Sequence, residues 1–492
     1  MVLWCYNVEG DFMAYFLKQS NLKKGLYLQI YESFYNPEKN QTSHRSVKAL
    51  GYVNDLISED IPDPVAFYKA GVSKMNDERK KEKTRLISSS SAIRHIGYFP
   101  FKAILENLNI SRYIDFFHLT NDFDFKLSDV LSSLIYARAV NPCSKHRTFH
   151  EVMPCLYESY DFSYDQLLEG LGFLGNEYEK IVELFTSQIR DKYGLNTSQT
   201  YFDCTNFYFE IDREDDFRRK GPSKENRRDP IVGLGLLLDA NQIPIGMKMY
   251  PGNESEKPVL RDVINGLKQR HNIEGHTVQV ADKGLNCAEN IYNARQNGDG
   301  YLFSKSVKQL PETEKTWVLL EHGYHDVRDK DGTLKYRWKE CVDKFPYTYT
   351  DSNGKRHTLN LTEKRVVTFN PSLAKKKKIE IERMVEKAIT LSSSMAKRNE
   401  YGETSRYVLF KSTSKGKKTE DKVKTELNQE QIQKDLELAG YNLLVTSEIK
   451  MSAQDIYDTY HNLWRIEESF RIMKTDLDAR PVYLQKEENI KG

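Results

Sequence analysis

The chain has 492 residues, of which 39% are hydrophobic and 29% charged, and its formal net charge is +2. At roughly 100–200 residues per domain, this length suggests two to four domains with enough apolar side chains for a buried core. The near-zero charge excludes a global electrostatic argument for a nucleic-acid or membrane partner, so any such argument depends on local patches.

The sequence contains no membrane-spanning or secretory pattern. Its longest apolar run, Ile231–Leu238, is far shorter than the ~20 residues that cross a bilayer. The N-terminal segment carries Glu9 and Asp11 and has no long apolar stretch after a charged start. Six scattered cysteines form no C-x-x-C pair, which argues against a disulfide framework and a zinc site. We therefore expect a protein of the reducing cytoplasm with no membrane partner.

The first two hundred residues divide into two parts. Residues 1–90 are predicted to be an N-terminal region and linker, with an alternating strand at 26–30 and a charged, then serine-rich linker at 75–91. Residues 91–197 have a helical period and are predicted to be a helical region. Several apolar residues share one helix face there, namely Leu127, Val130, Leu131, Leu134 and Ile135.

Residues 198–304 are predicted to form an α/β unit. Its predicted strands are 200–209, 231–238, 243–250 and 277–282, and its predicted helices are 256–270 and 287–297. The continuous apolar run at 231–238 is typical of a central strand. The order is three strands, a helix, a strand and a helix.

The remaining residues have a different composition. Between 305 and 448, strand-like pieces alternate with basic runs; the pieces are 316–320, 336–341, 365–369, 406–411 and 441–445. Residues 371–424 hold 15 Lys or Arg and 7 Asp or Glu, a local net charge of +8. Composition alone leaves open whether this stretch binds phosphates or is a solvated surface. Residues 453–478 are predicted to be a helix within the last segment, 449–492.

Two aspartates stand in unusual places. Asp203 lies inside an apolar strand, between Phe202 and Cys204, where an aspartate is disfavoured unless something compensates it. Asp282 ends a short strand, and catalytic groups often gather at the carboxyl ends of sheet strands. The alternative for each is an aspartate that caps a helix or stabilises a turn.

A glutamate near the end of the chain is a third candidate. The last predicted helix has an apolar stripe at helical spacing, formed by Ile456, Tyr460, Leu463, Trp464 and Phe470. Glu467 is predicted to lie in that stripe, whereas Glu468 faces solvent. A carboxylate on an apolar face needs a cationic partner, and the alternative is a salt bridge to Arg471 or Lys474. Three such carboxylates can hold two Mg²⁺ ions about 4 Å apart for an in-line phosphoryl displacement.

The segment from Tyr460 to Lys474 resembles the C-terminal signature of bacterial insertion-sequence transposases of the DDE class. In the group that it resembles, this signature is Tyr, two residues, Arg, three residues, Glu, six residues and Lys. Tyr460, Glu467 and Lys474 match it, Leu463 stands in the place of the Arg, and Arg465 follows two residues later.

Further segments resemble the same family in the expected order. Asp203-Cys-Thr resembles the strand of the first aspartate, and Asp282-Lys-Gly resembles the block of the second. The remaining matches are 221–229, 251–253 and 480–483. The resemblance covers roughly residues 200–490.

The resemblance implies a ribonuclease-H-like α/β core whose first three strands are antiparallel, interrupted by a large, mainly β insertion at 305–448 and preceded by a helical N-terminal region. It implies a transposase that cleaves and joins insertion-sequence ends, with Asp203, Asp282 and Glu467 as catalytic residues. These residues would bind two Mg²⁺ ions, with Mn²⁺ as a substitute.

It also implies partners. These are double-stranded DNA, as element inverted repeats and target, and a second copy of the chain in an active, nucleoid-associated homodimer. Tyr460, Arg465, Arg471 and Lys474 would contact DNA near the site. The basic stretches 213–228 and 371–424 would attract phosphates. The helical region 91–197, with the N-terminal part, would bind the inverted repeats.

Two alternatives remain open at this point. One is a metal-dependent DNA nuclease on the same core, without strand transfer. The other is an inactive DNA-binding remnant, because the family continues past the position of Gly492 with further apolar helices, and a truncated copy is therefore expected.

Overall fold

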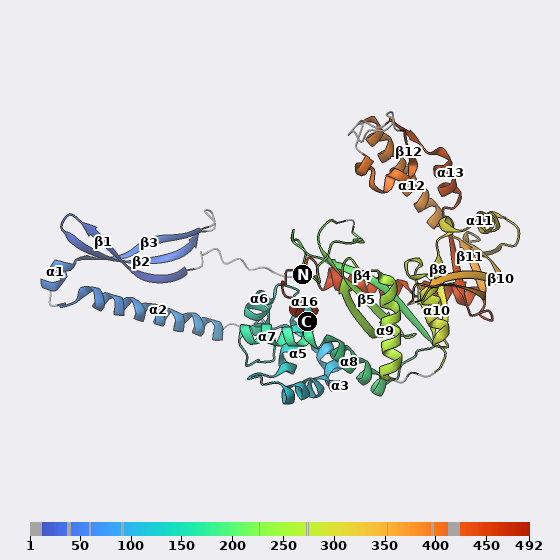
Figure 1. Cartoon of the computed structure of the whole chain (residues 1–492). Coiled ribbons are helices and arrows are strands. Elements are labelled where there is room, and N and C mark those ends of the chain that lie inside the picture. Colours follow the sequence, from blue (N-terminus) through green and yellow to red (C-terminus); the bar gives the residue numbers. More distant parts are fainter. Residues whose placement is uncertain are drawn as a thin grey trace. The chain divides into compact units, whose positions relative to one another are not determined.

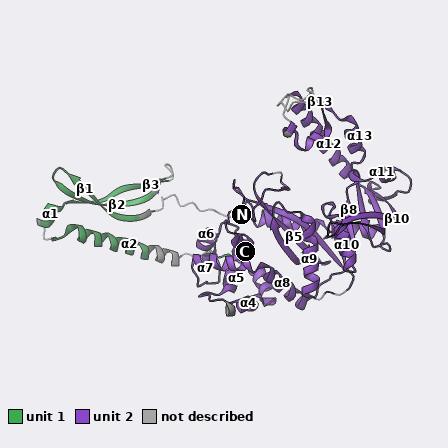
Figure 2. Ribbon diagram, in the orientation of Figure 1, with its two compact units in different colours: residues 1–95 green, residues 96–492 purple. Residues whose placement is uncertain are grey.

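The computed structural model describes residues 12–36, 41–58, 61–89, 93–225, 227–271, 273, 275–351, 353–394, 398–411 and 424–492. The chain divides into two compact units, residues 1–95 and residues 96–492 (Figure 2). Among the described residues, no helix is both long and apolar enough to cross a membrane.

The first unit is a three-stranded antiparallel sheet with two helices. Its elements are β1 (Phe12–Leu22), β2 (Gly25–Asn36), β3 (Gln41–Tyr52), α1 (Val53–Ser58) and α2 (Pro64–Ser89). The predicted strand at 26–30 is confirmed within β2. Residues 75–89 of the predicted linker form the end of α2, because Lys, Glu and Arg are good helix formers. Ser90 and Ser91 lie outside the described residues.

The second unit begins with the predicted helical region, which is confirmed. Its helices are α3 (Phe99–Asn107), α4 (Ile110–Ile114), α5 (Leu127–Val140), α6 (Lys145–Arg147), α7 (Tyr164–Asn176) and α8 (Tyr178–Tyr193). On α5, Leu127 and Val130 are fully buried, as the predicted helix face requires. A capping box of Ser163 and Gln166 fixes the start of α7.

A nine-stranded mixed sheet forms the centre of the second unit (Figure 1). Its order is β6-β5-β4-β7-β8-β14-β11-β10-β9. The predicted strands and helices of residues 198–304 are confirmed as β4 (Gln199–Tyr208), β5 (Ile231–Leu238), β6 (Pro244–Pro251), α9 (Glu256–His271), β7 (Val278–Ala281) and α10 (Ala288–Gln296). A further strand that was not predicted, β8 (Gly300–Lys305), follows them. Strands β4, β5 and β6 are antiparallel, whereas β7 and β8 run parallel to β4.

The segment predicted as a mainly β insertion extends this same sheet. Its elements are α11 (Glu312–Leu319), β9 (His325–Arg328), β10 (Leu334–Thr350), β11 (Arg356–Phe369), α12 (Pro371–Ser393), β12 (Val408–Lys411), β13 (Lys424–Leu427), α13 (Gln429–Glu437) and β14 (Tyr441–Thr446). β14 pairs with both β8 and β11, so the sheet runs without a break from the core into the insertion.

The predicted content of this insertion needs correction, because helices occupy much of it. The strand predicted at 316–320 is wrong, since Glu312–Leu319 forms α11. The basic stretch after residue 370 begins with α12, whose first turn has Pro371 and an N-cap at Asn370 that accepts a hydrogen bond from the backbone of Leu373. Its buried residues, Ala374, Ile381 and Ala388, recur every seven positions, so the lysines lie on the solvated side.

The C-terminal helix is confirmed as two helices, α14 (Ala453–His461) and α15 (Trp464–Arg471), followed by a π-helical turn at Ile472–Asp476. They cover one face of the sheet, and α9 covers the other (Figure 1). The last helix, α16 (Glu487–Lys491), packs closely on α7, where a Cβ added at Gly175 would lie 1.7 Å from the Glu488 carbonyl oxygen.

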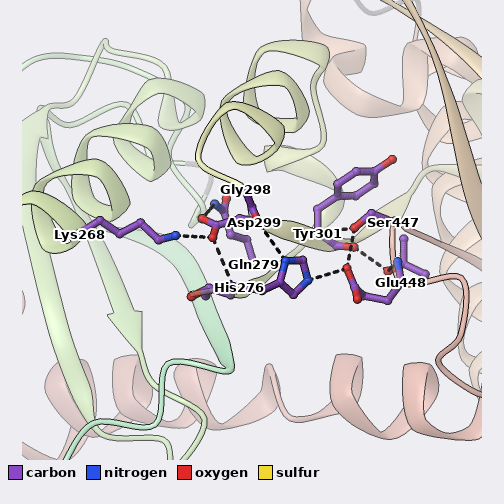
Figure 3. A network of polar contacts seen from close by, with 10 residues as sticks. Lys268, His276, Gln279, Gly298, Asp299, Tyr301, Ser447 and Glu448 are labelled. Carbon is purple, nitrogen blue, oxygen red and sulfur yellow. Dashed lines mark hydrogen bonds and ion pairs between the residues drawn. The ribbon is translucent and has the colours of Figure 1, made fainter. Parts of the chain in front are cut away.

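A polar network joins the starts of β7 and β8 to the end of β14 (Figure 3). Buried Asp299 accepts hydrogen bonds from Lys268 on α9 and, at 3.0 Å, from Gln279 on β7. His276 contacts the Gly298 carbonyl oxygen through Nδ1 at 2.8 Å and Oε1 of Glu448 through Nε2 at 3.0 Å. The network ties the end of the insertion to the core strands.

Candidate active site

The strand register brings Asp203 and Asp282 next to each other. β4 and β7 are adjacent and parallel, and Phe202 is the partner of Ala281. The two aspartates each follow by one residue, so they are neighbours across a spacing of about 4.8 Å between strands. Tyr201 and Val280, two positions before them, pack with α14 and α15. Because strand side chains alternate, both aspartates face the helix pair that carries Tyr460 and Glu467.

Asp203 is a half-buried carboxylate in a site of mixed charge. Its Oδ1 accepts a hydrogen bond from the backbone N–H of Cys204 at 2.8 Å, and Nζ of Lys224 lies 3.6 Å from the same oxygen. Burial raises the pKa of Asp203 to about 6, the Lys224 ammonium and the Cys204 N–H oppose this, and the charges of Glu256 and Asp282 add to it. The strand position and this pKa distinguish Asp203 from a capping aspartate.

Asp282 is held by two hydroxyl groups. Its Oδ1 accepts hydrogen bonds from Oγ of Ser304 on β8 at 2.6 Å and from the Tyr460 hydroxyl on α14 at 2.8 Å. Burial would raise the pKa of Asp282, but the hydrogen bonds from Ser304, the Lys283 backbone and Tyr460 outweigh it, so this pKa lies below its usual value. Two of these three partners, Ser304 and Tyr460, come from other elements, so Asp282 does more than cap the short turn at Lys283–Leu285.

Tyr460, predicted to contact DNA, instead makes its hydrogen bond within the site. Burial raises the pKa of its hydroxyl, and the negative charges of Asp282 and Glu467 raise it further. Tyr460 therefore lies within electrostatic reach of both carboxylates. Its hydroxyl remains protonated at neutral pH and acts as the donor to Asp282.

The prediction that Glu467 lies in the buried stripe is wrong. Its side chain is exposed, Glu468 is half-buried, and Trp464 is 50% exposed. The buried stripe runs in unbroken steps of three and four residues through Ile456, Thr459, Leu463, Ile466 and Phe470. Ile466 therefore holds the place in the stripe that was predicted for Glu467.

The salt-bridge alternative for Glu467 is not observed either. Arg471 lies 3.6 Å from Glu468 and 3.2 Å from Asp476, and Lys474 lies 3.1 Å from Glu225. Among the residues that the structure describes, no group of three or more His, Cys, Asp or Glu side chains could hold one ion. Convergence of all three carboxylates on metal therefore stays a prediction.

The basic residues predicted to contact DNA lie in different environments. Arg465 and Arg471 are exposed, and the Arg465 guanidinium lies 5.0 Å from the centre of the Trp464 ring. Lys474 is largely buried, and burial lowers its pKa although the hydrogen bond to Glu225 opposes the shift. Only the two arginines are open to a large ligand in this conformation.

Three residues of the site could not be identified from sequence patterns alone. Besides Ser304, they are Lys224, in the loop before β5, and Glu256, in the first turn of α9. Nζ of Lys224 lies 3.7 Å from Oε1 of Glu256, and an acidic residue at a helix start looks like an ordinary helix-end charge. Two glycines bring this loop close to β6: a Cβ at Gly221 would lie 1.8 Å from the Gly252 carbonyl oxygen. In the sequence, only the glycines at 221 and 252 indicate that this loop lies close to β6.

The donor set fits a hard divalent cation. Asp203 and Asp282 offer carboxylate oxygens, which are the ligands that Mg²⁺ prefers. The hydrogen bonds from Ser304 and Tyr460 to Asp282 both fall on Oδ1.

A search among curated proteins finds no match to the chain. A family model, the transposase DDE domain, matches residues 202–491, a span from β4 to α16 that includes both aspartates and Glu467. This match covers more than half of the sequence, and the chain therefore belongs to the DDE transposase family.

Proposed function

We propose that the protein is a DNA transposase that cleaves insertion-sequence ends and joins them to target DNA. Asp203, Asp282 and Glu467 would hold two Mg²⁺ ions, or Mn²⁺ in their place. Bound divalent ions stabilise charge on the attacking and leaving oxygens of an in-line phosphoryl displacement. The strand order β6-β5-β4-β7-β8, with its first three strands antiparallel, supports a ribonuclease-H-like core.

The proposal rests chiefly on the neighbouring positions of Asp203 and Asp282. They lie at one register on parallel strands, on the face that α14 and α15 cover. Ser304 and Tyr460 hold one oxygen of Asp282 and thereby fix the direction of the other. The exposed Arg465 and Arg471 would contact the DNA backbone, and two copies of the chain would act on the two ends of an element.

The test is strand cleavage and joining with labelled duplexes that carry both DNA flanks of the reading frame, in Mg²⁺. Asp203→Asn, Asp282→Asn and Glu467→Gln should each lower cleavage by about 10³-fold or more while DNA affinity stays within about twofold. Glu468→Gln is the matched control and should be mild. Normal cleavage by either aspartate variant would sink the proposal, and loss with Glu468→Gln alone would reassign the glutamate.

Pre-cut ends separate the transposase from a nuclease on the same core. A transposase joins a free 3′-OH to target DNA, which yields a longer labelled product. A nuclease yields shorter fragments only, and this result would identify the protein as a nuclease instead of a transposase.

A further inference from the structure

Lys224 and Glu225, two neighbouring residues of the loop before β5, have opposite charges and both make ion pairs at the candidate site. Nζ of Lys224 lies 3.6 Å from Oδ1 of Asp203 and 3.7 Å from Oε1 of Glu256, and it donates a hydrogen bond to the Cys204 carbonyl oxygen. Every group that Lys224 faces in these contacts is an oxygen acceptor. This is the environment that a metal cation requires.

The next residue, Glu225, makes the reciprocal contacts. Its Oε1 lies 3.1 Å from Nζ of Lys474 and also accepts a hydrogen bond from Arg480. Its Oε2 is buried and has no hydrogen-bond partner among the described residues. An oxyanion between a lysine and an arginine is the arrangement in which proteins hold phosphate groups.

We propose that Lys224 and Glu225 are internal substitutes for the ligands of the site: the Lys224 ammonium occupies the position of a cation at Asp203, and the Glu225 carboxylate occupies that of a DNA phosphate between Lys474 and Arg480. This inference rests on the proposed function and deepens it. It assigns Lys474 and Arg480 to one phosphate subsite, and it makes Lys224 a competitor of the divalent ion.

The contacts of Lys224 and Glu225 are weak enough for a metal ion and a phosphate to replace these side chains. The side chains of Lys224 and Asp203 are 41% and 23% exposed, and ion pairs between partly solvated groups contribute little to stability. The contact of Glu225 is incomplete, because one carboxylate oxygen is left without a hydrogen bond. A phosphate, with more acceptor oxygens than a carboxylate, would satisfy the two bases at least as well.

The metal half of the inference is tested by Mn²⁺ binding to the full chain, measured by electron paramagnetic resonance without DNA. Lys224→Met should raise Mn²⁺ affinity by about 5–10-fold, because the competing charge is removed. Lys257→Met is the matched control: Lys257 neighbours Glu256 along the chain, is exposed, and makes no ion pair in the described structure, so its effect should stay below about twofold. Equal Mn²⁺ affinities of the two variants would overturn the inference.

The phosphate half is tested with a fluorescent duplex of random sequence, since backbone contacts do not depend on sequence. Glu225→Gln should strengthen binding and steepen the dependence of affinity on salt by about one to two phosphate contacts. The control is Glu210→Gln, because Glu210 lies in the same connection and pairs only with Arg227 at 3.4 Å in the described structure. Identical salt slopes for both variants would overturn the inference. Wild-type protein that binds neither Mn²⁺ nor DNA would instead overturn the proposed function.

Discussion

The hydroxyl of Tyr460 donates a hydrogen bond of 2.8 Å to Oδ1 of Asp282, although 178 residues separate them in the chain. This contact joins α14 to the end of β7, across the face of the sheet that also carries Asp203. It places an uncharged donor at one carboxylate oxygen and thereby restrains the carboxylate group. Tyr460 is therefore a positioning residue for the second aspartate.

Tyr460→Phe should slow strand cleavage by about 10–100-fold with DNA affinity unchanged, because an orienting hydrogen bond is lost while the ring still packs. The pKa of Asp282 should also rise, since one of the groups that lower it is removed. Cleavage rates across a pH series would measure both effects. Ser304→Ala should act in the same direction, and full activity of both variants would show that neither hydroxyl orients the carboxylate.

Lys268→Met should destabilise the second unit by about 3–5 kcal/mol, because it leaves a buried carboxylate without its cation. The side chain of Asp299 is fully buried, and that of Lys268 is 15% exposed (Figure 3). Denaturant unfolding provides the measurement. The control is Lys248→Met, which breaks the more exposed pair with Asp262 and should cost less than about 1 kcal/mol. If both variants lost the same free energy of unfolding, the ion pair of Lys268 with Asp299 would not be a stabilising buried pair.

The stability of the network in Figure 3 should depend on pH through His276. The hydrogen bond to the Gly298 carbonyl oxygen raises the pKa of His276 above its usual value, and Glu448 adds to this. Only the doubly protonated ring can donate to both partners. A raised pKa gives stability that is complete below about pH 6.5 and is lost as pH rises through the folded-state pKa.

Melting temperatures between pH 5.5 and 8.5 would measure this effect. The wild-type protein should lose about 1–3 °C more than His276→Gln over that range, a small change because the ring is half exposed. Parallel curves for the two proteins would exclude a role of the imidazolium.

Charge reversal on α12 should weaken DNA binding if the basic stretch attracts phosphates. Lys375 and Lys376 are exposed at its start, and the double change Lys375→Glu/Lys376→Glu should lower the salt slope by up to about two contacts. Lys330→Glu/Lys335→Glu, also exposed and near the β9–β10 turn, is the matched control. An unchanged affinity and slope for the α12 variant would leave this stretch as a solvated surface.

The sequence was most informative where local pattern and environment agree. The apolar run at Ile231–Leu238 is the fully buried strand β5, and Asp203 is conspicuous because its neighbours, Phe202 and Cys204, are buried. Once β4 and β7 pair in parallel, Asp203 and Asp282 become neighbours. These features depend on few residues close in the chain, which is why they could be predicted.

Other features depend on contacts that no local pattern contains. Ile466 and Glu467 both lie at helical spacing from Leu463 and Phe470, and only the packing of α15 on the sheet decides that Ile466 is the buried one. Lys224 meets Asp203 and Glu256 only after its loop has folded onto the end of β6. The helix α12 was not predicted, because a lysine-rich run has the same composition in a loop and on a solvated helix face.

The pairing of β14 with β8 and β11 has a consequence for the order in which the protein forms during synthesis. The two aspartates leave the ribosome long before α14, and β14 immediately precedes the helices that bear Tyr460 and Glu467. A nascent chain that ends before Tyr441 holds both aspartates without Tyr460 and without the strand that closes the sheet between β8 and β11. The hydrogen bond that holds Asp282 therefore arises only after the insertion has been made, and an unfinished chain has both aspartates but not the donor that orients the second.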